Sequence, residues 1–243
     1  MTPELLVLAA TAASIGLVHT LLGPDHYVPF IVMAKARGWS LGKAMGVTAL
    51  CGLGHVASSI TIGVIGIALA MSVGGLEMLE GVRGNWAAWA LIAFGLTYFA
   101  WGLKKAYKDR PHSHTHDHGD GVMHNHNHNH HSGHAHVHPA KTGLGITPWA
   151  LFIVFVLGPC EPLIPVLMYP VAQMGLAGMD SIAGVIAISA IFGVTTLVTM
   201  TAVVAVGVVG LRRITLGPAT RFSHALAGGA VALSGCAIVF LGV

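Results

Sequence analysis

Charged residues are scarce in this 243-residue chain. Asp, Glu, Lys and Arg make up 9% of the sequence, whereas 54% is hydrophobic and the mean hydropathy is +0.75. A soluble globular domain carries about 25% charged residues, which it needs to cover its surface. This chain cannot cover a soluble globule in that way, so the composition predicts an integral membrane protein with lipid as its surroundings.

Other features that the sequence lacks exclude further classes. Three cysteines are too few for a secreted disulfide scaffold. Twelve Lys and Arg residues are too few for a nucleic-acid-binding face, so no nucleic-acid partner is expected. No GxxxxGK[ST] motif for ATP is present. The N-terminus carries Glu4 and no basic segment, which favours a permanent first span over a cleaved signal peptide.

Six apolar stretches are long enough to cross a bilayer, which takes about 20 residues. They are roughly residues 5–22, 41–73, 86–103, 146–168, 182–211 and 222–241. Eleven of the twelve basic residues fall in one alternate set of connections, and Arg83 is the exception. Because Lys and Arg are enriched in cytoplasmic loops, we expect a multi-pass protein of the cytoplasmic (inner) membrane with both termini outside.

A short internal repeat supports this count. The run Gly23-Pro24-Asp25-His26 has a counterpart in Gly158-Pro159-Cys160-Glu161, and each run interrupts the first apolar segment of a three-span half. Since three is odd, the halves would be inverted relative to each other, as in many secondary transporters. The predicted fold is therefore all-α, with two inverted three-helix repeats and a broken first helix in each. The expected units are residues 1–107, 108–143 and 144–243.

Ionisable residues at bilayer depth are rare and usually face a cavity or one another. The candidates here are His19, Asp25, His26, His55 and Glu161, with Cys160 as a softer group. In a straight helix His19 and His26 would stand about 10 Å apart. A break at Gly23-Pro24 could fold Asp25 and His26 back toward His19. Imidazole, carboxylate and thiolate ligands together favour Ni²⁺, Co²⁺ or Zn²⁺ over Mg²⁺ or Ca²⁺.

The run from His19 to His26, HTLLGPDH, resembles the first-span signature of the UreH-like and NicO-type nickel/cobalt transporters, a branch of the LysE/TauE-like membrane superfamily. Leu53-Gly54-His55 with Ser58 and Ser59 is similar to the second-span His motif of the same proteins. The resemblance implies about six spans, transport of Ni²⁺ or Co²⁺, and metal handling by His19, Asp25, His26 and His55. Five residues separate His19 from Asp25 where the better-known permeases have four, which places the chain nearer the UreH-like branch.

Twelve of the sixteen histidines lie in one polar segment between Arg110 and Lys141. The segment has no apolar periodicity, so we expect a disordered cytoplasmic loop that gathers or buffers metal through exchangeable imidazole ligands. Its candidate ligands are His112, His114, His116, His118, His124, His126, His128, His130, His131, His134, His136 and His138.

Two other interpretations stay open beside a transporter. The Pro159-Cys160 break is similar to those of the CcdA/DsbD-like thiol electron carriers, although Asp25 stands where the partner cysteine would be. A metal-sensing or urease/hydrogenase accessory protein would bind metal without moving it.

We expect a transporter and no enzyme, with a divalent metal ion as substrate. A cytoplasmic metallochaperone and a second copy of the chain are the partners that this arrangement would accommodate. Anion export would call for a basic residue at membrane depth, and the span pattern predicts none.

Overall fold

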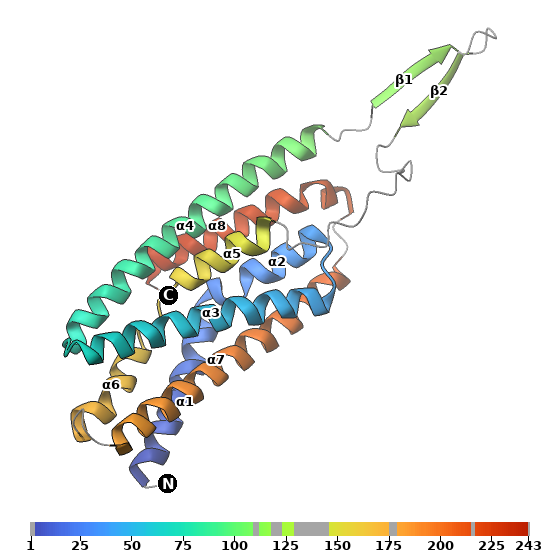
Figure 1. The fold of residues 1–243 in the computed structure, drawn as a ribbon. Coiled ribbons are helices and arrows are strands. Elements are labelled where there is room, and N and C mark those ends of the chain that lie inside the picture. The colour runs from blue at the N-terminus through green and yellow to red at the C-terminus, as the bar shows by residue number, and fades with distance from the viewer. Residues whose placement is uncertain are drawn as a thin grey trace.

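The computed structural model describes residues 3–108, 112–117, 123–128, 146–174, 179–214 and 217–242. The described chain is a bundle of helices (Figure 1). The α-helices are α1 (Pro3–Leu22), α2 (Val28–Arg37), α3 (Leu41–Ala68), α4 (Val73–Lys108), α5 (Ile146–Leu157), α6 (Leu163–Met174), α7 (Met179–Arg213) and α8 (Ser223–Leu241). Two short 3-10 segments, η1 (Pro24–His26) and η2 (Gly217–Phe222), precede α2 and α8.

The first apolar segment is broken at Gly23. Pro24 begins η1, since proline cannot continue the hydrogen-bond ladder of α1 but fits the first position of a new turn. The chain then enters α2, and the two arms of this broken segment meet at an angle of 83°. The sequence pattern predicts the break but not α2, because its basic residues Lys35 and Arg37 read as part of a connecting loop.

The predicted fourth span is also broken. It consists of α5 and α6, which are 12 residues each and are separated by residues 158–162. Each helix is about 18 Å long, less than the roughly 30 Å of a hydrocarbon core. Both breaks therefore lie where the repeated Gly-Pro pairs predict them. The inverted relation of the two halves stays a prediction.

Four described helical segments are long and apolar enough to cross a membrane: 41–68, 73–108, 183–213 and 219–241. The bent pair formed by α1 and α2 brings the number to five if it counts as one span. The chain thus has the character of a multi-pass membrane protein, with fewer demonstrated spans than the six expected.

One predicted boundary is wrong. The third span was expected to begin near Trp86, which would leave Glu77, Glu80 and Arg83 in an outer loop, whereas α4 begins at Val73 and contains all three. Helical spacing explains the difference, because Glu80 is buried on the same face as Leu76 and Gly84. The expectation that no basic residue lies inside the helical bundle is corrected by Arg83, whose side chain is only 11% exposed.

Helix α8 lies alongside the second half of the longer helix α4 (Figure 1). Their contact uses glycine on both helices: an added Cβ on Gly95 would lie 2.7 Å from Ala232 Cα, and one on Gly228 would lie 2.7 Å from Phe99 Cα. Small residues at such a crossing let two backbones approach closely, which is how helices commonly associate in membranes.

Part of the His-rich segment forms two antiparallel strands, β1 (His112–Asp117) and β2 (Met123–His128). The disorder expected of residues 108–143 as a whole stays a prediction. Their alternation of His with Ser, Thr or Asn has the period of two that a strand requires. The register pairs His112 with His128, His114 with His126 and His116 with His124. The other candidate ligands of this segment, His118, His130, His131, His134, His136 and His138, lie outside the described residues.

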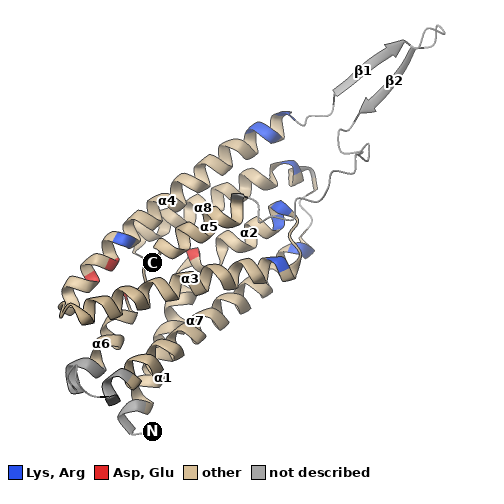
Figure 2. Ribbon diagram, viewed as in Figure 1, with Lys and Arg blue, Asp and Glu red and all other residues tan. Residues whose placement is uncertain are grey.

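Basic residues gather at one end of the bundle, where α2, α4 and α7 finish and α3 begins (Figure 2). Arg83 lies apart from them near Glu77 and Glu80 on α4. This distribution matches the alternation on which the predicted orientation depends.

Candidate metal centre

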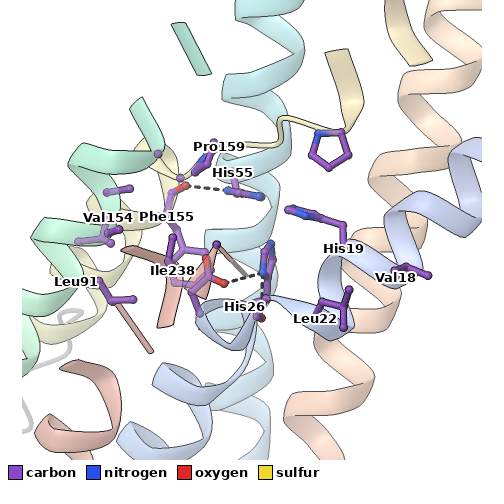
Figure 3. Close-up of a pocket in the computed structure, with 18 of the residues that line it drawn as sticks. Val18, His19, Leu22, His26, His55, Leu91, Val154, Phe155, Pro159 and Ile238 are labelled. Carbon is purple, nitrogen blue, oxygen red and sulfur yellow. Dashed lines mark hydrogen bonds and ion pairs between the residues drawn. The ribbon is translucent and has the colours of Figure 1, made fainter. Parts of the chain in front are cut away.

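Three histidines lie close to one another beside a pocket (Figure 3). His19 lies in the last turn of α1, His26 ends η1, and His55 is near the midpoint of α3. One ring nitrogen of each lies within 4.8 Å of the others. The centroids of the His19 and His26 rings are 4.7 Å apart, and those of His26 and His55 are 5.2 Å apart.

The break at Gly23 is what brings His26 beside His19. A Cβ at position 23 would lie 2.5 Å from His26 Nδ1 and 2.8 Å from Asp25 Oδ1, so only glycine leaves room for this turn. The expected folding of His26 back toward His19 is confirmed by the contact of the two rings.

Hydrogen bonds fix which nitrogen is available on the rings of His26 and His55. His26 Nδ1 lies 3.0 Å from Asp25 Oδ1 and 3.2 Å from the Gly23 carbonyl, so it is the donor and Nε2 carries the lone pair. His55 Nδ1 donates to the Phe155 carbonyl at 3.2 Å, which leaves its Nε2 as an acceptor. The Nε2 atoms of His19 and His26 are buried and have no hydrogen-bond partner.

Buried imidazole nitrogens without partners are costly, and a metal ion would satisfy them. Ligands bound at 2.0 to 2.1 Å in a tetrahedral site stand about 3.4 Å apart. The rings would need to approach one another by about an ångström to bind one ion. Three neutral imidazoles suit Zn²⁺, Ni²⁺ or Co²⁺, and they suit Mg²⁺ or Ca²⁺ poorly.

Cys160 is the group of the second break that contacts one of the three histidines, His55, although it is not among the ligand atoms that lie within 4.8 Å of one another. Its Sγ lies 2.9 Å from His55 Nε2, and the residue is fully buried. Gly158 permits the contact, because a Cβ there would lie 2.9 Å from His55 Nδ1. The two breaks, far apart in the sequence, therefore meet at His55.

The two predicted carboxylates occupy different places. Asp25 is partly buried and contacts the Nδ1 of His26, the position from which a carboxylate orients a metal-binding histidine. Glu161 is exposed and stands outside the three-histidine group. Its side chain lies near Gly81 of α4, so the structure does not bring it to the imidazoles.

A cavity of about 490 Å³ opens beside the three histidines. It is lined by His19, Asp25, His26 and His55 together with apolar residues of α4, α5 and α8 (Figure 3). A second hollow of about 370 Å³ shares His19, Pro159 and Ile238 with the first, and Glu161 and Asn85 line it. The hollow that Glu161 borders therefore adjoins the cavity beside the histidine cluster.

Helix α4 carries a buried ion pair that the sequence pattern does not predict. Arg83 Nη1 lies 2.9 Å from Glu80 Oε1, and both side chains contact Ser59 of α3. Glu80 also accepts the backbone N–H of Cys160 at 3.0 Å. The spacing of three residues between Glu80 and Arg83 in an apolar stretch could have indicated a helical pair.

The described cysteines give no support to a thiol electron carrier. Cys51, Cys160 and Cys236 are all unpaired. Cys51 packs with Phe30 and Met200, whereas Cys160 packs in a separate apolar cluster with Leu163 and Phe192. An electron relay needs two thiols that can form a disulfide, and the structure brings no two together.

No known protein family, no curated protein and no solved structure matches this chain.

Proposed function

We propose that this protein is a secondary transporter that moves a divalent transition-metal ion across the membrane, with Ni²⁺ or Co²⁺ as the favoured substrate and Zn²⁺ as a further candidate. One observation carries the proposal: three imidazoles from three separate elements converge on a cavity, and two of their ring nitrogens are buried without partners. His19, His26 and His55 would bind the ion, and Asp25 would orient His26.

The breaks in the helices favour transport over a purely structural metal site. Discontinuous helices at the centre of a bundle are typical of transporter binding sites, where free backbone groups and polar side chains face the substrate. Both breaks of this chain lie at the three histidines. The first break supplies His26, and the second supplies Cys160, which contacts His55. A movement of either break would change the ligand set and release the ion.

The His-rich segment supports the same substrate. Its imidazoles would offer weak, exchangeable sites from which metal passes to or from the membrane site. The UreH-like and NicO-type resemblance implies Ni²⁺ or Co²⁺ as well. Movement would be driven by an ion gradient or by a partner chain, since no ATP-binding motif is present.

The proposal is tested by measuring the flux of Ni²⁺, Co²⁺, Zn²⁺ and Mn²⁺ into proteoliposomes that contain the protein. We expect His26→Ala to abolish saturable flux, because it removes an unpartnered ring nitrogen from the site. Asp25→Asn should weaken apparent affinity about 10-fold to 100-fold, the usual effect of losing a carboxylate that orients a ligand. His224→Ala is the matched control, since His224 contacts Tyr98 outside the cluster. Unchanged flux in His26→Ala would contradict the site.

A metal-sensing accessory protein is the second candidate, favoured by the twelve histidines between His112 and His138. Deletion of residues 112–138 distinguishes the two functions. A transporter should keep its flux with altered metal dependence, whereas a sensor should show no flux in either form and lose its metal response.

A further inference from the structure

We propose that the buried Glu80–Arg83 pair of α4 is a positioning device that holds Cys160 as the fourth ligand of the metal site formed by His19, His26 and His55. This inference rests on the proposed function, because it concerns the same site. It assigns a role to two charged residues that the proposed binding of metal by histidine leaves unexplained.

Arg83 binds the end of α5. Its Nε donates to the Leu157 carbonyl at 3.1 Å, and one terminal nitrogen donates to the Gly158 carbonyl and to Ser59 Oγ. The last carbonyls of a helix have no partner within the helix, and a break inside a bundle leaves them without water. The guanidinium satisfies these carbonyls and thereby fixes where α5 stops.

Glu80 binds the backbone of Cys160, two residues further along the same break. Its side chain is fully buried, and Oε2 accepts both the backbone N–H of Cys160 at 3.0 Å and Ser59 Oγ at 3.2 Å. Its other oxygen pairs with Arg83 at 2.9 Å. The ion pair therefore contacts residues 157, 158 and 160 and determines the path of the chain between them. Close contact between Gly84, the residue after Arg83, and Pro159 continues this interface.

The result of this path is the contact between Cys160 Sγ and His55 Nε2 at 2.9 Å. His55 Nε2 is an acceptor, since its Nδ1 donates to Phe155, so the thiol donates to it. When a metal ion takes the place of that hydrogen, His55 Nε2 and Cys160 Sγ both bind the ion and the thiol proton leaves to solvent. Cys160 Sγ contacts His55 and stands outside the three ring nitrogens that lie within 4.8 Å of one another, so it would move toward His19 and His26 to complete a site of three imidazoles and one thiolate.

An apolar contact could hold α4 against α5 equally well, but it could not bind these backbone groups. Two carbonyls and one N–H of the break need polar partners, and the described structure supplies them from Glu80 and Arg83. A thiolate ligand would also favour late first-row ions over Mn²⁺ and Mg²⁺. The ion pair thus acts on metal selectivity through the position of one sulfur atom.

Co²⁺ absorption of the purified full chain in detergent tests the proposal. A thiolate bound to Co²⁺ gives a ligand-to-metal charge-transfer band, which imidazole ligands do not give, so Co²⁺ on the His-rich segment does not obscure it. We expect the parent to show this band and Cys160→Ser to lose it while still binding Co²⁺ through histidine.

Glu80→Gln and Arg83→Gln should weaken the charge-transfer band and lower Co²⁺ affinity about 10-fold to 100-fold, with the ligand-field bands of the imidazole-bound ion retained. Arg83→Lys keeps the charge but cannot bind both carbonyls, so it should give the same loss and serves if Arg83→Gln fails to fold. Glu77→Gln, an exposed carboxylate on the same helix, is the matched control and should resemble the parent.

If the parent binds no more Co²⁺ than a variant with His19, His26 and His55 all changed to Ala, the proposed function itself is overturned. A parent that binds Co²⁺ at these histidines without a thiolate band would overturn only the role of Cys160. A band of full intensity in folded Arg83→Lys and Glu80→Gln would overturn the positioning role.

Discussion

Asp25 and Glu161 are both acidic residues at helix breaks, yet the structure gives them different surroundings. Asp25 contacts His26 and is four-fifths buried, whereas Glu161 is exposed and borders the hollow that adjoins the site. A buried carboxylate beside a histidine can orient that ring. An exposed carboxylate at the border of a hollow can raise the local concentration of cations, because it attracts them before they bind.

Glu161→Gln is therefore expected to lower the rate of metal flux at low substrate concentration and to leave the maximal rate unchanged. The reason is that the substitution removes an attractive charge but no ligand. The difference from the parent should shrink as salt is raised, since salt screens exposed charges. Flux measured over a range of metal and salt concentrations checks this, with Lys108→Gln at the basic end as a charge-changing control. A reduced maximal rate would instead indicate that Glu161 acts within the site.

The residues of the site were predictable where a polar side chain lies within an apolar segment of the sequence. His19, His26 and His55 are ionisable residues in apolar segments, and the structure brings all three together. Glu80 and Arg83 were missed because the sequence pattern placed them in a loop, where charged residues are ordinary. Their burial depends on how far α4 extends and on which helix it meets, and neither follows from local sequence.

At the level of elements, each break combines a proline that ends a helix with a glycine that leaves space for a side chain. Gly23 leaves space for His26, and Gly158 leaves space for His55. The long helices are held differently, by glycines that allow two backbones to touch. Gly95 and Gly228 of the α4–α8 pair are the clearest case, since their nearest neighbours are backbone atoms that cannot rotate away.

Gly95→Ala should destabilise the protein by about 1 to 3 kcal/mol, the usual cost of an added methyl group in a full interface. The methyl group would collide with the backbone of Ala232 and force α4 and α8 apart. Thermal unfolding in detergent measures the effect. Gly229→Ala is the control, because a Cβ there would lie at an ordinary 3.6 Å from the Phe99 ring. Equal stability of the two variants would contradict the close contact.

The positions of the helices were largely predictable from apolar length, and the breaks from the repeated Gly-Pro pairs. The sequence does not predict the early start of α4 or the existence of α2, because charged residues in both stretches match the pattern of a loop. The strands β1 and β2 were missed for a related reason: alternating polar residues have the period of a strand but no apolar face to indicate one.

Across the whole molecule, an apolar core separates the histidine cluster from the basic end. Phe30 and Met33 of α2, Cys51 of α3 and Phe155 of α5 belong to this core, and the rings of Phe30 and Phe155 lie 4.7 Å apart. On another side the cluster borders the cavity and the hollow near Glu161. An ion moving toward the basic end would need these helices to separate, which is the movement that alternating access describes.

The central claim is that His19, His26 and His55 together bind one divalent transition-metal ion, and equilibrium dialysis with Ni²⁺ or Co²⁺ tests it most directly. A chain without residues 112–138 avoids binding by the His-rich segment and keeps every described helix. We expect this chain to bind one ion, and the same chain with all three histidines changed to Ala to bind none. Equal binding by the two chains would contradict the claim.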